Sequence, residues 1–141
     1  MDDLGILRTI PSLNIYTPCD SNELEHCINQ TILNNGPSYI RIGKKGEEIL
    51  SDFDPLSSPI AINWISRGGD IAVIGYGPIL SEAVSIKKDL KKINKEISII
   101  SVIKFSPFDT KVLKSLTKNG IKHLIVLEEH YSSSGLFSKI S

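Results

Sequence analysis

The second half of the chain alternates between apolar runs and stretches with helical periodicity. Three runs are mostly apolar, at positions 71–75, 97–103 and 123–127. Such runs are typical of strands buried on both faces of a sheet. Between them, apolar residues recur at helical spacing over 79–93 and around 112–116. This alternation predicts a three-layer α/β fold with a parallel sheet, and a further helix is expected to begin near Gly135.

The first 43 residues predict a strand, a helix and a second strand. A β-prone run at 14–17 ends at Pro18, and Asp20 with Glu23 forms the pattern of a helix-capping box. The helix is expected to expose His26 and to bury one stripe of residues, namely Leu24, Cys27, Ile28, Thr31 and Ile32. The helix should stop at the Asn-Asn-Gly-Pro run of residues 34–37, before a strand over 39–42.

The middle of the chain has a different composition. Polar residues follow Gly43, and turn-forming residues cluster at 52–55 and 57–59. Residues 44–67 are therefore interpreted as a linker between two lobes, with Ile60, Ile62 and Trp64 packed on a surface. The predicted organisation is an N-terminal part over 1–43, this linker, and a C-terminal domain over 68–141 that looks incomplete.

Composition excludes several classes of function. The chain has 141 residues and is 40% hydrophobic, the size of one domain or of one domain with part of another. Its formal net charge of zero predicts neither a nucleic-acid partner nor a membrane surface. The sequence has no run of about 18 apolar residues, so it predicts no transmembrane helix, and its acidic start does not resemble a secretory signal. Cys19 and Cys27 fit no metal spacing and predict free thiols in the cytoplasm.

Arg41 is the best candidate for a binding residue on chemical grounds. It ends a predicted strand, where open α/β sheets bind ligands, and its planar guanidinium suits a phosphate monoester. The alternative is an ordinary surface arginine at a strand exit. The cluster Glu128, Glu129 and His130 follows another strand and could transfer protons, although a structural role at a domain contact is favoured. Gly75 and Gly77 are interpreted as a tight strand-to-helix turn rather than a dinucleotide-binding loop.

Five runs in the chain together resemble a known family. They are D-L-G-I-L-R-T-I-P at 3–11, G-P-S-Y-I-R-I-G at 36–43, G-D-I-A-V-I-G-Y-G at 69–77, S-P-F-D at 106–109 and E-E-H-Y-S-S-S-G-L at 128–136. In this order and spacing they resemble the back half of the transketolase family, whose enzymes depend on thiamine diphosphate. The chain departs from the family pattern at four positions: Thr17 replaces a frequent arginine, Ser106 a lysine, and Ser134 and Phe137 usual glycines.

The resemblance implies a fold, and it implies which functions belong to this chain and which to an upstream part of the enzyme. Residues 1–43 would be the end of a pyrimidine-binding domain, and residues 68–141 most of a transketolase C-terminal domain. Arg41 matches the arginine that binds the phosphate of the sugar substrate. No catalytic residue is expected in this chain, because the family's activating glutamate lies upstream of the matched segment. Thiamine diphosphate and Mg²⁺ would be held upstream as well, so this chain alone is not expected to bind them.

The implied enzyme transfers a two-carbon ketol unit between sugar phosphates. This chain would then need a missing N-terminal portion or subunit as its partner, and the complete enzyme would be a homodimer. A deoxyxylulose-phosphate synthase or a 2-oxoacid dehydrogenase beta subunit is the alternative within the superfamily. A non-catalytic dimerisation module is the alternative outside it, favoured by the replacements at Ser134 and Phe137. The sequence leaves open whether Arg8 pairs with an acid or faces the active cleft.

Overall fold

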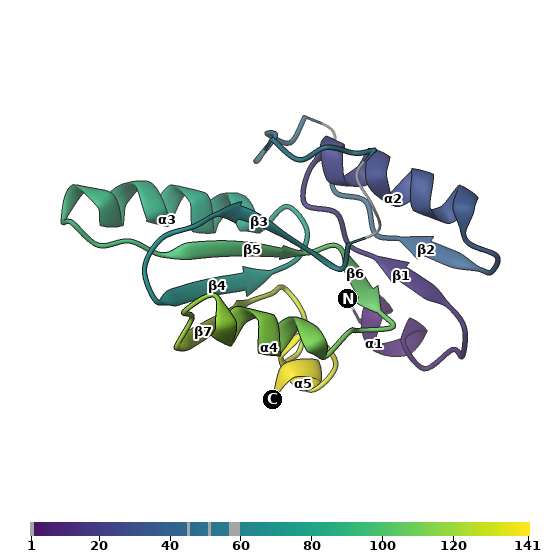
Figure 1. Ribbon diagram of the computed structural model, residues 1–141. Helices are drawn as coiled ribbons and strands as arrows, with labels where there is room; N and C mark the ends of the chain where they lie inside the picture. Colours follow the sequence, from purple (N-terminus) through teal and green to yellow (C-terminus); the bar gives the residue numbers. More distant parts are fainter. Residues whose placement is uncertain (1, 45, 51, 57–59) are drawn as a thin grey trace.

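The computed structural model describes residues 2–44, 46–50, 52–56 and 60–141, which form two β-sheets side by side (Figure 1). None of the helices in these ranges has the length and apolarity needed to cross a membrane. In chain order the elements are α1 (Asp3–Leu7), β1 (Asn14–Tyr16), α2 (Ser21–Leu33), β2 (Ser38–Ile40), β3 (Ile62–Ser66), β4 (Ile71–Gly75), α3 (Leu80–Lys92), β5 (Ser98–Val102), β6 (Lys104–Ser106), α4 (Lys111–Lys118), β7 (His123–Leu127) and α5 (Phe137–Ile140).

The C-terminal half is the three-layer α/β unit that the apolar runs predict. Its four-stranded sheet has the order β3-β5-β4-β7, and β4 runs parallel to both β5 and β7. Helix α3 covers one face, while α4 and α5 lie on the other (Figure 1). Val73 in β4 stands between Ile99 and Ile125, so the centre of the sheet is apolar. The bounds of β4 and β7 are the predicted ones.

Residues 62–66 are the edge strand β3, and their placement in a linker was wrong. Ile62 pairs with Val102 and Trp64 with Ile100, in antiparallel register against β5. Every residue of β3 is only half-buried, and polar Asn63 and Ser66 interrupt the apolar pattern, which explains why the strand was missed. The turn expected at 57–59 lies outside the described residues.

A second, three-stranded sheet joins the first through one continuous segment. Strand β1 pairs in parallel with β2 and antiparallel with β6, and only Ile103 separates β6 from the end of β5. Ile15 of β1 and Phe105 of β6 belong to the same buried cluster as Ile74 of β4 and Tyr76, which follows that strand. The ring centroids of Tyr76 and Phe105 are 5.3 Å apart in a T-shaped contact. The two sheets therefore share a core.

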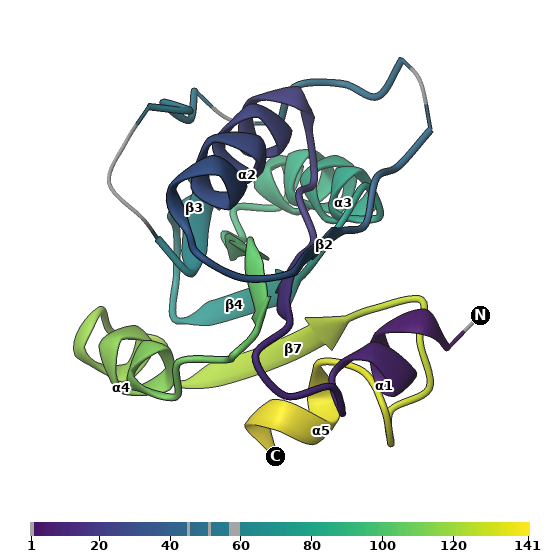
Figure 2. The ribbon, with the colours of Figure 1, turned by 90° about the vertical axis from the view of Figure 1, so that its right-hand side faces the viewer.

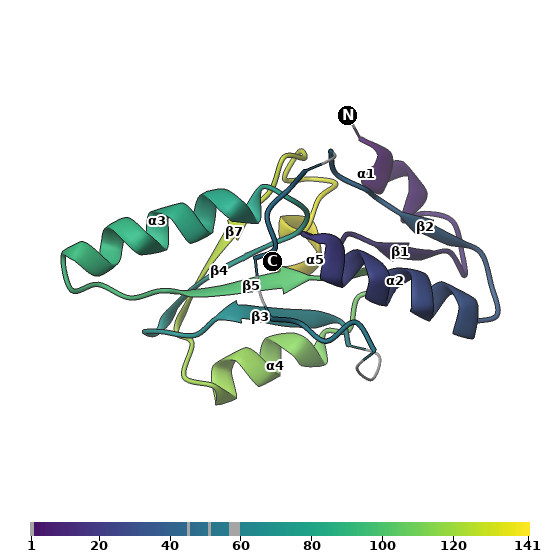
Figure 3. The same cartoon turned by 90° about the horizontal axis from the view of Figure 1, so that it is seen from above.

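Helix α2 covers the three-stranded sheet with a face that the sequence did not predict (Figure 3). Its fully buried residues are Glu23, His26, Cys27 and Gln30, whereas Ile28 and Ile32 are 45% and 76% exposed. The predicted apolar stripe and the predicted solvation of His26 were therefore wrong, although Cys27 is in the core as expected. The polar face is tolerated because Glu23 accepts hydrogen bonds from Ser101 Oγ and Asn63 Nδ2 at 2.8 and 3.0 Å.

The two ends of the described chain pack against each other. Helices α1 and α5 lie side by side (Figure 2), and Arg8 Nη1 donates a hydrogen bond of 2.6 Å to Ser138 Oγ. Arg8 Nη2 also donates to the carbonyl oxygen of Ser133 at 3.3 Å. Ser134 Oγ donates to Asp2 Oδ1 at 2.5 Å. Arg8 therefore fastens the C-terminal segment to α1, and within the described ranges it forms no ion pair with an acid.

Candidate functional site

Arg41 lies at the exit of β2, where the sequence predicts it. Its backbone N–H donates to the carbonyl oxygen of Tyr16 at 2.9 Å, so Arg41 is still held beside β1. Its side chain is 22% exposed, and Nε lies 3.3 Å from Oδ2 of Asp3 in α1. Nη1 is 3.9 Å from the position that a Cβ would take on Gly77. The guanidinium is thus fixed between α1 and the turn that leads into α3.

A cavity of about 700 Å³ opens in front of Arg41. Arg41 and Lys44 are its only cationic lining residues within the part of the chain that the structure describes, and the start of α3 forms the opposite wall. Four carboxylates also line the cavity, those of Asp3, Glu47, Glu82 and Glu129. The cavity therefore offers donors from Arg41 and Lys44 and acceptors from four carboxylates, one of which, Asp3, is paired with Arg41.

Asp3 orients Arg41 and is itself held on both oxygens. Tyr39 Oη donates to Asp3 Oδ2 at 2.9 Å, and His130 Nε2 lies 2.9 Å from Oδ1. Because a carboxylate only accepts, Nε2 of His130 carries the hydrogen. Burial raises the pKa of Asp3, but the hydrogen bonds from His130 and Tyr39 and the charge of Arg41 outweigh it. The pKa of this carboxyl therefore lies below its usual 3.8.

The contacts continue from His130 into the C-terminal domain. Its other ring nitrogen, Nδ1, lies 2.8 Å from Tyr76 Oη, which also contacts Glu128 Oε2 at 3.2 Å. Burial, and secondarily the neighbouring Glu128, raises the pKa of the Tyr76 phenol, so this group is neutral at physiological pH. We name the connected side chains of Arg41, Asp3, His130, Tyr76 and Glu128 the polar relay. It links the cavity to the start of α5, where Glu128 accepts backbone N–H groups.

Glu128 and Glu129 have different surroundings. Glu128 Oε2 accepts the backbone N–H of Leu136 at 2.6 Å and Oε1 that of Phe137 at 3.2 Å, at the start of α5. A Cβ on Gly135 would collide with this carboxylate, which explains the glycine there. Glu129 instead lines the Arg41 cavity. The cluster at 128–130 thus has the structural role favoured by the sequence for two of its members, and only Glu129 faces the cavity.

The Gly75 to Gly77 segment is a tight turn, as predicted. Gly77 has φ of +72°, and its N–H donates to the carbonyl oxygen of Thr17 at 3.2 Å. A Cβ on Gly75 would lie 2.5 Å from the carbonyl oxygen of Leu127. Gly75 is therefore explained by its close packing against β7, and Gly77 by its positive φ.

The cysteines offer no reactive group in the folded chain. Cys19 and Cys27 are free and buried, and burial raises the pKa of both thiols. Among the described residues, no three His, Cys, Asp or Glu side chains gather as a metal site requires. The groups that the cavity presents are the cations of Arg41 and Lys44 and the carboxylates that line it.

Known proteins resemble the chain along its whole length. The family described as "Transketolase, C-terminal domain" matches residues 61–141. One of the subunits that form the apulose-4-phosphate transketolase of Actinobacillus succinogenes is 32% identical, over 100% of this chain and 45% of that protein. The 1-deoxy-D-xylulose-5-phosphate synthase of Exiguobacterium sibiricum is 29% identical, over 98% of this chain and 22% of that protein.

The fold is also that of a solved transketolase. A split gene transketolase in an inactive beta4 tetramer superposes with a TM-score of 0.85 at 21% identity, over 99% of this chain and 46% of that one. The chain therefore spans less than half the length of the relatives it matches. The family match covers more than half of the chain and coincides with the four-stranded sheet and its helices. On these grounds, the chain belongs to the transketolase family.

Proposed function

We propose that the chain is the C-terminal part of a thiamine-diphosphate-dependent enzyme that transfers a two-carbon ketol unit between sugar phosphates. The observation that carries this proposal is the guanidinium of Arg41, which Asp3 orients and which lines the 700 Å³ cavity. A polypeptide of a transketolase named for apulose-4-phosphate aligns with all of this chain, which supports a phosphorylated substrate.

Arg41 is proposed to bind the substrate phosphate. Its Nε is taken by Asp3, so the two Nη groups remain to donate to phosphate oxygens. Lys44 adds a second positive charge on the same side of the cavity. The carboxylates of Glu47, Glu82 and Glu129 are placed to accept hydrogen bonds from sugar hydroxyls. A phosphorylated polyol matches this distribution of cations and acceptors.

The cofactor is proposed to sit outside this chain. Thiamine diphosphate carries a diphosphate that needs a divalent metal, and no cluster of metal-ligating side chains occurs in the described ranges. No site for the diphosphate and its Mg²⁺ is proposed among the described residues. We assign both, together with the acid that activates the cofactor, to an upstream segment or partner subunit.

The same reasoning extends to assembly. Large apolar side chains that are exposed in the isolated chain occur on α2, β7 and α5, for example Ile32, Leu33, Ile125 and Phe137. Such surfaces are typical of interaction sites, and the proposed partner is the upstream half of the enzyme within a homodimer. The buried free thiols suit the reducing cytoplasm, which is the proposed location.

Reconstitution tests the proposed function. The chain is mixed with the upstream polypeptide of its enzyme, thiamine diphosphate and Mg²⁺, and ketol transfer between sugar phosphates is measured. We expect turnover by the mixture and none by either polypeptide alone. Turnover by this chain without the upstream polypeptide would contradict the proposal.

A deoxyxylulose-phosphate synthase is the second candidate. It is favoured by the 29% identity to such a synthase over nearly the whole chain. The same mixture distinguishes the two, since a synthase releases carbon dioxide from pyruvate in the presence of glyceraldehyde 3-phosphate, whereas a ketol transferase acts on sugar phosphates alone.

A further inference from the structure

The contacts along the polar relay need one hydrogen more than their groups usually carry. Asp3 Oδ1 lies 2.9 Å from Nε2 of His130, and Nδ1 of the same ring lies 2.8 Å from Tyr76 Oη. Oη in turn lies 3.2 Å from Oε2 of Glu128. A neutral imidazole and a phenol supply one hydrogen each, and carboxylates supply none. With a neutral ring, two hydrogens would therefore have to serve these three contacts.

The neighbouring bonds place the missing hydrogen on Nδ1 of His130. Burial raises the pKa of the Tyr76 phenol, so Oη keeps its single hydrogen. Glu128 accepts the backbone N–H groups of Leu136 and Phe137 on its two oxygens, and such bonds favour a carboxylate over a carboxylic acid. Since a carboxylate only accepts, Oη donates to Glu128. Oη then accepts from Nδ1, which must carry a hydrogen as Nε2 does.

The charges around the ring agree with this count. The His130 side chain is 0% exposed. The titratable and charged side chains around it come from α1, from β2 and its exit, and from the segments after β4 and β7. They are Asp3, Tyr39, Arg41, Tyr76 and Glu128. Among them two carboxylates face one guanidinium, so a neutral ring leaves one negative charge uncompensated, whereas an imidazolium balances the group.

We propose that the polar relay holds one extra proton and that the resulting His130 imidazolium positions Arg41 through Asp3. The functional consequence rests on the proposed function, in which Arg41 binds the substrate phosphate. The imidazolium holds Oδ1 of Asp3, while Oδ2 stays beside Nε of Arg41. Its positive charge also offsets the carboxylate that a phosphate meets next to Arg41. His130 does not line the Arg41 cavity, so it is a positioning residue.

Loss of the extra proton has a defined consequence. When His130 becomes neutral at higher pH, Tyr76 must donate to Nδ1, and its hydrogen bond to Glu128 is lost. Asp3 then keeps a neutral partner in place of a cationic one, and Arg41 is held less firmly. Affinity for a phosphorylated sugar should therefore fall as pH rises. Ionisation of the phosphate does not give this trend, because its second proton is lost near about pH 6 and the dianion is the better ligand for arginine.

Imidazole NMR of the full chain tests the proton directly and needs no turnover. The chain is made with isotope-labelled histidine, and the ring signals are assigned by correlation to their own backbone amides. We expect both ring nitrogens of His130 to carry hydrogens at about pH 7.5, where exposed His123 is mostly neutral and serves as the internal reference. A neutral His130 at that pH, in either tautomer, would overturn the proposal.

Glu128→Gln and Glu129→Gln form a matched pair for the same measurement. The amide that replaces Glu128 donates an N–H to Tyr76 Oη, so Tyr76 can donate to Nδ1 and no extra proton is needed. We expect a neutral His130 at about pH 7.5 in Glu128→Gln and an imidazolium in Glu129→Gln, because Glu129 lines the cavity outside the relay. An imidazolium that persists in Glu128→Gln would contradict the hydrogen count.

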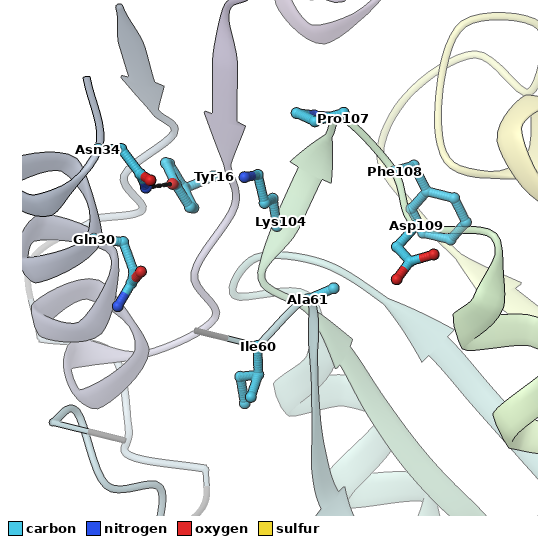
Figure 4. A pocket seen from close by; sticks show the side chains of 9 residues that line it. All are labelled: Tyr16, Gln30, Asn34, Ile60, Ala61, Lys104, Pro107, Phe108 and Asp109. Atoms are coloured by element: carbon cyan, nitrogen blue, oxygen red, sulfur yellow. Dashed lines mark hydrogen bonds between the residues drawn. The ribbon is translucent and has the colours of Figure 1, made fainter. Parts of the chain in front are cut away.

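The pH profile of the reconstituted enzyme tests the positioning role. From about pH 7 to about pH 9, KM for a phosphorylated acceptor should rise about tenfold in the wild type and stay level in Glu128→Gln, while KM for the unphosphorylated analogue stays level in both. The control is Lys104→Met, which removes a cation that lines a separate cavity of about 370 Å³ (Figure 4) and should keep the wild-type profile.

Two further results separate this inference from the proposed function. Parallel KM profiles for the wild type and Glu128→Gln would show that His130 does not position Arg41, and would overturn that part of the proposal. A mixture without any turnover would contradict the proposed function, and the NMR measurement on the chain would still decide whether the relay holds its extra proton.

Discussion

Asp3 and His130 are 127 positions apart in the chain, and their side chains meet at 2.9 Å. This contact closes the polar relay, because the other oxygen of Asp3 is the one beside Arg41. It joins α1, next to the proposed substrate phosphate, to the segment after β7. The orientation of Arg41 therefore depends on a residue of the C-terminal domain that does not line the Arg41 cavity.

Loss of His130 should destabilise the fold measurably. His130→Ala removes one hydrogen-bond partner from Tyr76 and one from Asp3, so we expect a loss of about 1–3 kcal/mol in the free energy of unfolding. Urea unfolding at pH 7 measures it, and His123→Ala on exposed β7 is the matched control, expected to change stability by less than about 0.5 kcal/mol. A double-mutant cycle with Asp3→Asn should give a coupling energy near about 1 kcal/mol. Additive effects of the two changes would argue against the contact.

The stabilising effect of Asp3 should vanish in acid. Its pKa is lowered in the folded chain, so its contribution is present above the usual value of 3.8 and is lost as pH falls through the lowered pKa. Urea unfolding of the wild type and of Asp3→Asn across this range should show a stability difference that shrinks below about pH 4. A difference that stays constant down to about pH 2 would contradict the assignment.

Glu23 should have the opposite pH dependence. The side chain is completely buried, and burial raises its pKa above the usual 4.5 despite hydrogen bonds from Cys19 N, Asn63 and Ser101. A raised pKa means that its stability contribution is fully present below 4.5 and declines as pH rises through the raised value. Glu23→Gln lacks this titration, so the wild type should lose stability relative to it as pH rises above 4.5. The opposite trend would contradict the prediction.

Truncation of Glu23 should cost much more than its amide replacement. Glu23→Ala removes the acceptor of three hydrogen bonds, those from Cys19 N, Asn63 Nδ2 and Ser101 Oγ, and we expect a loss of about 2–4 kcal/mol in the free energy of unfolding. Glu23→Gln keeps one carbonyl acceptor and is the matched control. Equal destabilisation by both changes in denaturant titrations would show that the hydrogen bonds accepted by Glu23 do not stabilise the fold.

The two thiols should not react with thiol reagents in the native chain. Cys19 and Cys27 are buried with raised pKa values, so little thiolate is available. A disulfide-exchange reagent at pH 8 should label both only after unfolding in guanidinium chloride, as read by mass spectrometry. Rapid labelling of either residue in the folded chain would contradict their burial.

The sequence predicted the central strands well and the helix faces less well. Strands β4 and β7 have the predicted bounds, because a continuous apolar run has one stable place in a parallel sheet. The buried face of helix α2 was predicted wrongly, because an interpretation by periodicity assumes that polar residues face water. Glu23 is paired instead with residues 40 and 78 positions away, Asn63 and Ser101. Such partners cannot be identified from local pattern.

The candidate site was predicted only in part, because partners that are distant in the sequence cannot be identified from local pattern. Arg41 was found because a strand exit is a local feature, whereas Asp3, Tyr76 and His130 join it only through the tertiary fold. Ser134 is a position where the sequence suggested a loss and the structure shows a contact. Its replacement of a usual glycine favoured a degraded module, yet its hydroxyl donates to Asp2 and fastens the C-terminal segment to the region before α1. That replacement is accommodated in the fold and is no sign of decay.

The role of Arg41 is the central claim, and the kinetics of the reconstituted enzyme test it most directly. Arg41→Met is compared with the wild type and with Lys118→Met, using a phosphorylated sugar acceptor and its unphosphorylated analogue. We predict that Arg41→Met raises KM for the phosphorylated acceptor by about 10- to 100-fold and leaves the KM of the analogue unchanged, since one charge-assisted contact is lost. An equal effect on both acceptors, or no effect on either, would contradict the account.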